Sequence, residues 1–486
     1  MSNPTSSGNR KKIIVLGAGI SGLTCAFRLH RAGFDVEVLE RESSPGGVMQ
    51  TRLQDGFLTE AGPNSFQSGE DILSLIHDAG LDGELLEAEA SLPRYIFFRG
   101  KLNLAPLGPG ALLTTPLLST GAKWKLLREP WAPSNADGHE ESIQEFVSRR
   151  LGPELHDVLL APLVSGIYAG DTRRLSMQSV FPLMVELEQK YGSLLKGFLK
   201  HAKEERRKRE AAGKPKPRRT LCSFTNGLKA LPEGIARNLG SRLHVDCVVQ
   251  SLQFTPERGF DLKATEKGVP KQFHSDGLVI ASSVLRAGEH LKDLARSKGA
   301  EALQAAGEAL QKVELPPLAG VCLAYKKTDV PHNLRGFGFL IPRSEKIRML
   351  GCIWSSSLFA HRAPEGWVLL TNFIGGATDP AILDLTEGQL LEAVRKDLRT
   401  VLGITAPPRV VALNRYEQAI PQYNLGHKAR IEEVLSAVST VPGLAITGNY
   451  LSGVSVGDCV KQASELVRQI CKEHGTAPDS QAGRED

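Results

Sequence analysis

Six residues near the N-terminus have the types and spacing of a loop that binds the pyrophosphate of a dinucleotide: Gly17-Ala18-Gly19-Ile20-Ser21-Gly22. In such a loop Gly17 permits a tight turn, Gly19 lets the backbone approach the phosphates, and Gly22 allows close packing of helix against strand. Glu40 ends the next strand-like stretch, where its carboxylate can accept hydrogen bonds from ribose hydroxyls. These residues together predict a bound dinucleotide.

The elements that must position this loop follow from the flanking residues. Residues 11–16 end in a continuous apolar run, which predicts a short buried parallel strand. Apolar residues then recur at helical spacing over 23–30, and Gly33 is a helix stop. Residues 35–40 alternate in polarity and predict a second strand. The N-terminus of the helix would offer free N–H groups to the phosphates, so a complete βαβ unit is predicted.

Further glycine-rich segments indicate which dinucleotide is bound. Gly46-Gly47 would let a second backbone segment close on the same ligand, which an extended molecule such as FAD needs more than NAD does. The alternative is an ordinary Pro-Gly-Gly turn. Residues 60–66 are too rich in glycine and proline for regular structure and predict a loop bordering a flavin. Residues 444–449 read as strand and turn, and residues 453–460 open a helix that runs to about Lys472.

The length and composition are those of a globular protein with two or three domains. The chain has 486 residues, of which 41% are hydrophobic and 23% charged. Two strand-like runs in the middle, residues 243–252 and 277–281, are assigned to the nucleotide-binding domain. That domain is therefore predicted to be discontinuous, built from the start, middle and end of the chain.

The positive charge is concentrated in one segment. Residues 203–219 hold nine basic and three acidic residues, a local charge of +6 in a chain of +5, so the remainder is near −1. A nucleic-acid-binding face is therefore not expected. Gly213, Pro215 and Pro217 favour a solvated linker. Attraction to anionic lipid headgroups is the alternative.

The cysteines and the other reactive residues do not form a metal or nucleophile motif. Seven scattered cysteines, with no C-x-x-C spacing, argue against a disulfide framework, an iron–sulfur cluster or a structural zinc and suit a reducing compartment. No secretory signal is recognised at the start. We therefore expect no metal site, and we assign no catalytic acid or base.

One uncharged run invites a membrane interpretation. The 21 residues between Lys101 and Lys123 could span a bilayer by length, but their three prolines and three glycines argue against a spanning helix. Residues 111–118 are apolar and precede Lys123, Trp124, Lys125, Arg128 and Trp131. Leucines beside tryptophan and basic residues are typical of an interfacial contact. A loop buried on the core is the alternative.

Five separated segments, in order, carry a family pattern: Gly62-Pro63-Asn64-Ser65-Phe66; Ser165-Gly166-Ile167-Tyr168-Ala169-Gly170-Asp171; Gly336-Phe337-Gly338-Phe339-Leu340; Ile420-Pro421-Gln422-Tyr423-Asn424-Leu425-Gly426-His427; and residues 448–459. With the glycine motif, they resemble the flavin-containing amine oxidase superfamily and, within it, the oxygen-dependent protoporphyrinogen oxidases of bacterial type. The resemblance covers residues 11 to 475, nearly the full length. Val48 departs from the arginine that many amine oxidases carry there, which disfavours an amine oxidase.

The resemblance implies an α/β fold with three parts: a discontinuous Rossmann-like FAD-binding domain, a mixed α+β substrate domain and a mostly helical membrane-associating domain. The expected bounds are 1–88, 220–283 and 436–476 for the FAD-binding domain; 89–92, 198–219 and 284–435 for the substrate domain; 93–197 for the helical domain; and 477–486 for a disordered tail.

The implied reaction is the FAD-dependent oxidation of protoporphyrinogen IX to protoporphyrin IX, a late step of haem biosynthesis, with O₂ as acceptor and H₂O₂ as by-product. The resemblance places the enzyme peripherally on the cytoplasmic side of the inner membrane, or in the cytoplasm. It leaves open a homodimer and the hand-over of product to a downstream chelatase.

Other functions on the same scaffold stay open. A coproporphyrinogen III oxidase, which would form coproporphyrin III, is the nearest alternative and would act on a substrate with four carboxylates. An FAD amine oxidase or a carotenoid desaturase is more distant. From another class, some proteins of this fold bind prenylated partners without using flavin, although the intact glycine motifs at both ends oppose that.

The resemblance also assigns site residues. Arg94 matches a position that pairs with a substrate propionate, Phe337 and Phe373 match positions that line the ring pocket, and Gly166 matches a backbone contact near the reacting carbon. His427 is interpreted as a structural hydrogen-bonding residue. The residues expected to bind the cofactor are Gly17, Ala18, Gly19, Ile20, Ser21, Gly22, Glu40, Arg41, Gly46, Gly47, Val48, Gly62, Pro63, Asn64, Ser65, Val249, Asn449, Val454, Ser455 and Val456.

Overall fold

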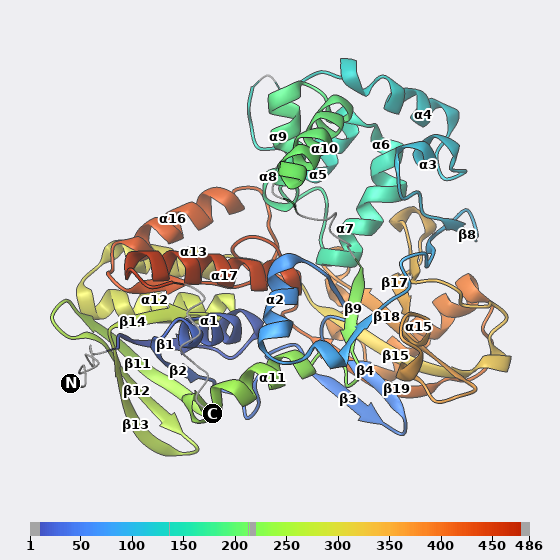
Figure 1. Ribbon diagram of the computed structural model, residues 1–486. Helices are drawn as coiled ribbons and strands as arrows, with labels where there is room; N and C mark the ends of the chain where they lie inside the picture. Colours follow the sequence, from blue (N-terminus) through green and yellow to red (C-terminus); the bar gives the residue numbers. More distant parts are fainter. Residues whose placement is uncertain (1–9, 136, 212, 214–219, 478–486) are drawn as a thin grey trace.

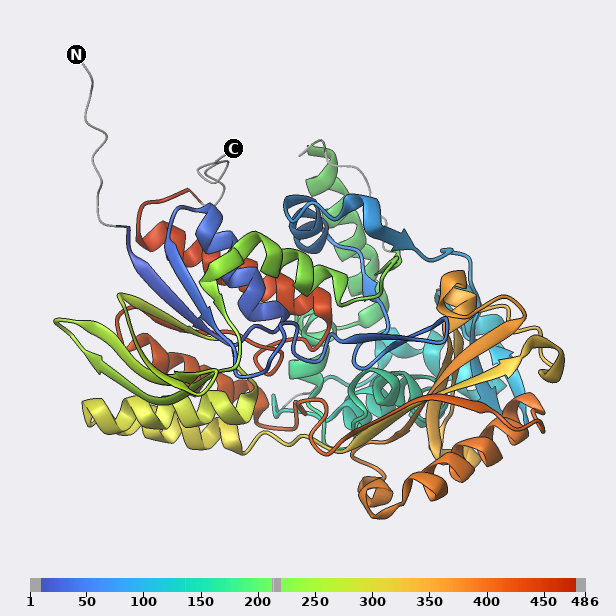
Figure 2. The same ribbon diagram turned by 90° about the horizontal axis from the view of Figure 1, so that it is seen from below.

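A computed structural model describes residues 10–135, 137–211, 213 and 220–477 of the chain. Figure 1 shows a lobe built on a parallel sheet, a second lobe built on a larger sheet, and a helical part above the junction. Figure 2 shows the two sheet-based lobes side by side. The N- and C-terminal ends of the described chain both belong to the first lobe.

The first lobe contains a five-stranded sheet in the order β10-β2-β1-β14-β20, whose paired strands are all parallel. Its strands are β1 (Lys12–Leu16), β2 (Asp35–Leu39), β10 (Leu243–His244), β14 (Gly277–Ile280) and β20 (Leu444–Ile446). Residues 13–16 and 277–280 are buried, as expected for strands covered on both faces. The chain start, middle and end thus meet in one sheet, which confirms the predicted discontinuity.

Each face of this sheet has its own cover. One hydrophobic cluster joins the sheet to α1 (Ile20–Arg31), α2 (Glu70–Asp78), α11 (Ala230–Leu239) and α17 (Val456–Glu473). A second cluster covers the other face with β11 (Cys247–Thr255), β12 (Gly259–Glu266), α12 (Val284–Lys298), α13 (Glu301–Gln311) and α16 (His427–Ser439). Strand β13 (Val269–Ser275) completes the sheet of β11 and β12.

The predicted strand over residues 243–252 is wrong in one respect. β10 ends at His244, and β11 begins at Cys247 in a different sheet. Between them Asp246 has a φ of +51°, a left-handed conformation that interrupts extended backbone. The run is therefore two strands that serve two sheets.

The second lobe contains a seven-stranded mixed sheet in the order β19-β15-β18-β17-β16-β7-β8. Its strands are β7 (Arg94–Phe98), β8 (Lys101–Leu104), β15 (Leu318–Lys326), β16 (Gly338–Leu340), β17 (Met349–Trp354), β18 (Trp367–Gly375) and β19 (Arg409–Tyr416). Helix α15 (Glu387–Leu402) packs on one face through Leu390, Val394 and Leu398. The hairpin of β3 (Thr51–Gln54) and β4 (Phe57–Glu60) packs on the other face through Phe57.

The remaining short elements lie beside these sheets. Strands β5 (Phe66–Gln67), β9 (Leu221–Phe224) and β6 (Leu85–Glu87) form a small antiparallel sheet, and the one-turn helices α14 (Ser355–Leu358) and η7 (Ala360–Arg362) follow β17.

The helical part shares one core of its own. Its helices are α3 (Pro109–Thr114), α4 (Thr120–Leu127), α5 (Ile143–Arg150), α6 (Pro153–Leu155), α7 (Ala161–Tyr168), α8 (Met177–Val180), α9 (Pro182–Tyr191) and α10 (Leu194–Ala211), with the turns η2 (Glu129–Trp131) and η3 (His156–Leu160). Leu117 and Leu118 are buried, so only part of the apolar run 111–118 faces solvent. Among the described residues, no helix combines the length and the apolar character needed to cross a bilayer.

Two of the domain limits expected from the sequence fall inside continuous structure. A limit at residue 93 would assign β7 to the helical part, whereas β7 pairs in parallel with β16 of the seven-stranded sheet. A limit at residue 197 would divide α10, which runs from Leu194 to Ala211. Residues 203–211 belong to this helix and do not form the expected linker. The tail 478–486 and residues 214–219 lie outside the described residues. The three-part division itself stays a prediction.

A buried ion network attaches α10 to the rest of the helical part. Arg150 and Glu129, both fully buried, form an ion pair. Glu129 also accepts hydrogen bonds from Ser193 Oγ at 2.7 Å and from the Leu194 N–H at 2.8 Å. Burial alone would raise the pKa of Glu129, but these donors and the Arg150 charge lower it below its usual value. The first turn of α10 is therefore held by an ionised carboxylate.

Candidate functional site

The predicted glycine loop joins β1 to α1 and is built from close backbone contacts. Gly17 has a φ of +104°, and a Cβ there would lie 2.9 Å from the Ala281 carbonyl oxygen. A Cβ on Gly22 would collide with the carbonyl oxygen of Gly17. Gly19 has no atom within 4 Å of its Cβ position, so its face is open to a ligand. The predicted strand, turn, helix and strand of residues 11–40 are confirmed.

Glu40 lies against this loop. Its side chain is buried, and Oε2 accepts a hydrogen bond from the Ala18 N–H at 2.6 Å while Oε1 accepts one from the Glu42 N–H at 2.9 Å. Arg41 is exposed and pairs with Glu42 at 3.0 Å. The carboxylate is thus held at the carboxyl end of β2, and its role toward ribose hydroxyls stays a prediction.

The second glycine pair packs on the first loop. The Gly46 N–H donates to the Ala18 carbonyl oxygen at 2.8 Å, and a Cβ on Gly47 would lie 3.5 Å from Gly19 Cα. Val48 is 64% exposed, which leaves its side chain free beside the loop. A Cβ on Gly62 would collide with the Val48 carbonyl oxygen. The stretches around Gly17, Gly46 and Gly62, distant in sequence, therefore form one cluster.

The C-terminal glycine-rich segment reaches the same edge. Since β1 and β20 both pair in parallel with β14, which lies between them, their carboxyl ends lie at the same edge of the sheet. Helix α17 packs along α1, where Cys25 Sγ donates to the Ala463 carbonyl oxygen at 3.7 Å and the Ser21 hydroxyl interacts with the Cys459 thiol. Both ends of the chain therefore contribute to one site.

The start of α17 differs from the expectation of free N–H groups for a ligand. Ser455 is the N-cap, and its Oγ accepts from the Asp458 N–H at 3.1 Å while Asp458 Oδ2 accepts from the Ser455 N–H at 3.2 Å. This capping box satisfies two amides with the chain's own side chains and places a carboxylate in the first turn. An anionic ligand would therefore favour α1, which has no acidic residue in its first turn.

The other residues expected at the cofactor lie farther along the same edge. Val249 is partly buried in β11, whose Cys247 N–H donates to the Glu40 carbonyl oxygen at 2.8 Å. Asn449 accepts a hydrogen bond at its carbonyl oxygen from the Tyr423 hydroxyl. Val454 precedes α17 of the first lobe and packs on the core of the helical part. It therefore lies where the first lobe and the helical part meet.

Three buried polar atoms around these loops have no hydrogen-bond partner within the described residues: Asn64 Oδ1, Ser282 Oγ and Thr447 Oγ1. Ser282 Cα lies 3.2 Å from the Cβ position of Gly17, and the Thr447 N–H donates to the Ile280 carbonyl oxygen at 2.9 Å. Buried polar groups are normally paired, so these atoms suit a ligand that brings its own donors and acceptors. The residues present therefore fit an extended dinucleotide such as FAD.

Two of the expected substrate residues are brought together by the seven-stranded sheet. Arg94 is exposed on β7 opposite Gly338 of β16, and its guanidinium lies 5.5 Å from the centroid of the Phe337 ring. The Phe337 N–H donates to the Pro93 carbonyl oxygen at 2.8 Å, which fixes the register. A cation is thus held near an aromatic ring on β7, one strand in from the edge of the sheet.

The other two expected substrate residues, Phe373 and Gly166, lie on or beside the same face of that sheet. Phe373 of β18 is paired with Gly351 of β17 and with Gly320 of β15, so glycines flank its ring on both sides. Leu340 is paired with Gly351, and a Cβ on Gly166 of α7 would lie 2.7 Å from Leu340 Cδ2. Because residues two apart on a strand face the same way, Arg94 and Phe373 share this face. It is the face that the β3–β4 hairpin of the first lobe covers.

The side chains beside this face that could titrate do not do so near neutral pH. Burial raises the pKa of Tyr168 to about 12 and lowers the pKa of His427 to about 4. Both rings contact Tyr423, which stacks on His427 at 4.3 Å between centroids. Both His427 ring nitrogens are buried, and hydrogen bonds to the backbone of Tyr450 and Leu451 oppose the fall in its pKa, which agrees with its interpretation as a structural hydrogen-bonding residue. The stacking role of Tyr423 was not predicted.

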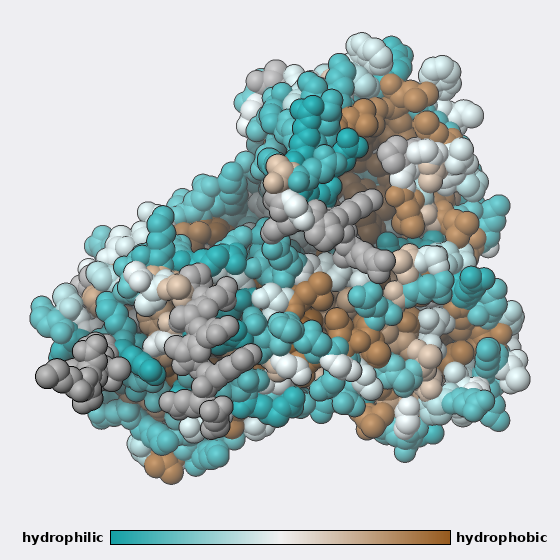
Figure 3. All heavy atoms as spheres, in the orientation of Figure 1, coloured by the Kyte–Doolittle hydropathy of each residue, from teal (hydrophilic) through white to brown (hydrophobic). Residues whose placement is uncertain are grey.

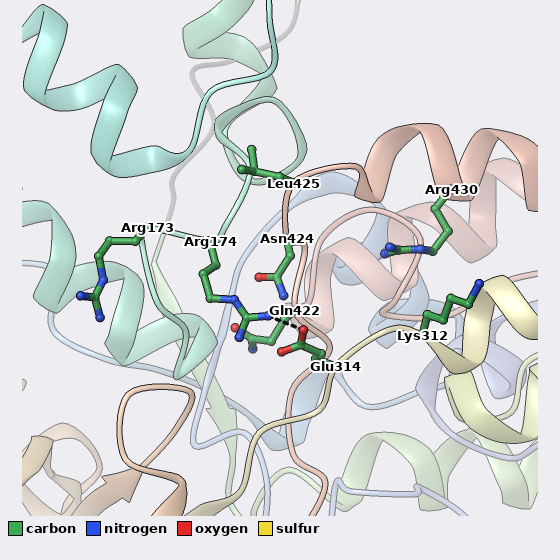
Figure 4. Close-up of a pocket in the computed structure, with 8 residues that line it drawn as sticks. All are labelled: Arg173, Arg174, Lys312, Glu314, Gln422, Asn424, Leu425 and Arg430. Atoms are coloured by element: carbon green, nitrogen blue, oxygen red, sulfur yellow. Dashed lines mark hydrogen bonds and ion pairs between the residues drawn. The ribbon is translucent and has the colours of Figure 1, made fainter.

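A surface groove that the sequence did not reveal lies near the base of the helical part (Figure 4). Its volume is about 290 Å³, and it is lined by Arg173, Arg174, Lys312, Glu314, Gln422, Asn424, Leu425 and Arg430. Arg174 is directed at Glu314 and pairs with it, and Arg173 pairs with Asp171 at 3.0 Å. The basic lining suits an anion. None of the residues expected to bind cofactor or substrate lines it. Gln422, Asn424 and Leu425 come from the family segment 420–427, whereas the basic residues of the groove come from three separate stretches.

Comparison with known proteins identifies relatives of this chain by sequence. The chain is 36% identical to a chloroplastic protoporphyrinogen oxidase of Oryza sativa subsp. japonica, over 94% of this chain and 87% of the relative. It is 30% identical to a coproporphyrinogen III oxidase of Bacillus subtilis, over 95% of this chain and 98% of the relative.

Solved structures share the fold. A crystal structure from Exiguobacterium sp. 255-15, provisionally assigned as a protoporphyrinogen oxidase, aligns with a TM-score of 0.76 at 26% identity and covers 95% of this chain and 99% of its own. A UDP-galactopyranose mutase aligns with a TM-score of 0.71 at 15% identity and covers 98% of this chain and 96% of its own, which shows the fold alone.

The sequence pattern that defines the flavin containing amine oxidoreductases matches residues 20–471, most of the chain and all three of its parts. That match agrees with the glycine loops, the parallel sheet and the second, mixed sheet described above. The chain belongs to the family of flavin containing amine oxidoreductases.

Proposed function

We propose that this protein is an FAD-dependent oxidase that converts protoporphyrinogen IX to protoporphyrin IX. The observation that carries the proposal is the sheet face on which Phe373 lies between Gly320 and Gly351 while Arg94 lies on β7, three strands away. Glycines leave flat space above a sheet, which suits a macrocycle, and an arginine suits its carboxylates. The chemistry that bound FAD supplies is hydride acceptance from the macrocycle, with reoxidation by O₂ to H₂O₂.

The protein's own residues bind and orient in this proposal. The Arg94 guanidinium pairs with a propionate, while Phe337 and Phe373 contact the ring and help to exclude water. Gly166 leaves room where a side chain would press on Leu340. Glu40 and the loops of Gly17, Gly46 and Gly62 hold the cofactor. No side chain is assigned as acid or base.

A second candidate function is the oxidation of coproporphyrinogen III. It is supported by the Bacillus subtilis relative and by a Staphylococcus aureus coproporphyrinogen III oxidase, which is 28% identical over 95% of this chain and 99% of the relative. The higher identity to the rice protoporphyrinogen oxidase favours protoporphyrinogen.

Turnover of the two porphyrinogens separates these functions. We expect kcat/KM to be about tenfold or more higher for protoporphyrinogen IX, because extra carboxylates without partners lose at least ~1.4 kcal/mol of binding. Porphyrin fluorescence measures the rates, and the flavin absorbance should bleach when the substrate is added without oxygen. A preference for coproporphyrinogen III would establish the second candidate, and a lack of bleaching with both would refute porphyrinogen oxidation.

The substrate role of Arg94 has a matched control. Arg94→Ala should raise KM for protoporphyrinogen IX about tenfold or more, since a hydrogen bond to a charged group contributes ~1.5–3 kcal/mol. The flavin content should not change. Arg99 lies 5.0 Å from the Phe98 ring centroid, much as Arg94 lies over Phe337, but in the β7–β8 turn. Arg99→Ala should leave KM unchanged. Equal KM values for the two variants would remove Arg94 from the site.

The cofactor loop can be tested by adding one methyl group. Gly22→Ala places a Cβ against the Gly17 carbonyl oxygen and should abolish flavin retention. Gly388→Ala, in helix α15, meets nothing within 4 Å and should retain the full flavin complement. The ratio of flavin to protein absorbance measures the effect, and circular dichroism checks folding. A fully flavinated Gly22→Ala protein would contradict this assignment.

Membrane contact through the helical part also belongs to the proposal, with the cytoplasmic face of the inner membrane as its location. Trp124 is 67% exposed, Trp131 80% and Leu107 69%, and Figure 3 shows hydrophobic surface on this part. Such residues beside lysine and arginine suit the interface of a bilayer. A homodimer and a hand-over to a chelatase stay predictions, which light scattering and a coupled chelatase assay would test.

Co-sedimentation with vesicles that contain phosphatidylglycerol tests the contact. Replacing Trp124 and Trp131 with serine should weaken partitioning about tenfold or more, because burying two indole rings contributes more than ~1.4 kcal/mol. Val269→Ser removes an apolar side chain that is 59% exposed on β13 and should have no effect. Equal partitioning of both variants and the original protein would exclude this surface.

A further inference from the structure

A buried ion pair lies beside the predicted flavin loop. Arg362 lies in η7, which follows β17 of the second lobe, and is 1% exposed; Glu60 ends β4, in the hairpin that packs on the second lobe's sheet, and is 3% exposed. Arg362 Nη2 lies 2.9 Å from Glu60 Oε1. The two residues are 302 positions apart in the chain.

The same guanidinium holds the loop that follows Glu60. Arg362 Nη2 donates to the Asn64 carbonyl oxygen at 3.1 Å and to Ser223 Oγ of β9 at 2.7 Å. The guanidinium also lies 5.1 Å from the centroid of the Phe359 ring. One side chain therefore contacts a strand, a loop and a second strand that are distant in sequence.

Both carboxylate oxygens of Glu60 have hydrogen-bond partners, whereas Arg362 Nε has none among the described residues. Its Oε2 accepts from Thr51 Oγ1 at 2.6 Å, and its Oε1 accepts from the Leu228 N–H at 3.0 Å. Burial raises the pKa of Glu60. The positive charge of Arg362 is the largest of the effects that lower this pKa. The Glu60 carboxylate therefore connects the β3–β4 hairpin to the segment before α11.

A second contact from the same lobe fixes the other end of the loop. The Tyr416 hydroxyl of β19 donates to the Ala61 carbonyl oxygen. Gly62 leaves no room for a side chain against the Val48 carbonyl, and Asn64 Oδ1 is buried without a partner among the described residues. The loop therefore has its backbone held from outside while one polar side-chain atom stays available.

We propose that Arg362 is a positioning residue for the cofactor: it holds the loop of residues 61–65 in the conformation that receives the flavin. A buried ion pair contributes little net stability compared with apolar side chains of similar volume, whereas it imposes a specific geometry. The inference rests on the proposed cofactor role of this loop. It makes the loop depend on a residue of the second lobe.

The test compares two buried arginines. Arg362→Met and the double variant Glu60→Gln/Arg362→Met remove the contact, and the double variant avoids leaving a buried unpaired carboxylate. Arg150→Met removes an arginine that is equally buried and ion-paired, but lies in the helical part. Each protein is stripped of flavin, and the dissociation constant for added FAD, the absorbance spectrum of the bound flavin and the thermal midpoint without flavin are measured.

We expect both Arg362 variants to bind FAD about tenfold or more weakly, a change of ~1.4 kcal/mol, and to shift the flavin absorbance band. Arg150→Met should lower the thermal midpoint but leave the flavin affinity within about twofold, as expected for a distant, independent site. If the Arg362 variants bind FAD no more weakly than Arg150→Met, the inference is overturned. If the unaltered protein itself binds no FAD, the proposed function fails instead.

Discussion

The site depends on backbone packed against backbone at the carboxyl edge of the parallel sheet. Side chains are excluded at Gly22, where the Gly17 carbonyl lies, and at Gly62, where the Val48 carbonyl lies. Gly47 in turn lies against Gly19. No larger residue fits at Gly22 or Gly62, so the three loops pack closely together beside the N-terminus of α1.

The second lobe supplies an apolar sheet and contacts the loop of residues 61–65. Phe373 lies between two glycines on one face of this sheet, while helix α15 fills the opposite face with leucines and a valine. Arg362 and Tyr416 extend from this lobe to the loop after β4. The proposed cofactor and substrate surfaces are therefore connected through a few buried polar contacts, whose geometry is more specific than apolar packing would be.

The helical part combines exposed apolar side chains with buried, paired charges. Its exposed tryptophans and leucines lie on short helices, and its interior contains a buried network of arginines and glutamates that anchors α10. Each buried charge has a partner of opposite sign, as burial requires. The network holds the first turn of α10. Farther along, Glu204 contacts Tyr191 and Lys190, and the basic segment continues as a helix to Ala211.

The amino-acid sequence by itself determined the βαβ unit, its glycine loop and the family, because glycine spacing and apolar periodicity act over a few residues. It also identified Arg94, Phe337, Phe373 and Gly166 through a family pattern, which the structure places on or beside one face of the sheet. Only the tertiary structure decided which distant groups meet. The contact of Arg362 with Glu60 and that of Tyr416 with Ala61 join residues that are distant in sequence and depend on long-range packing, for which no local pattern exists.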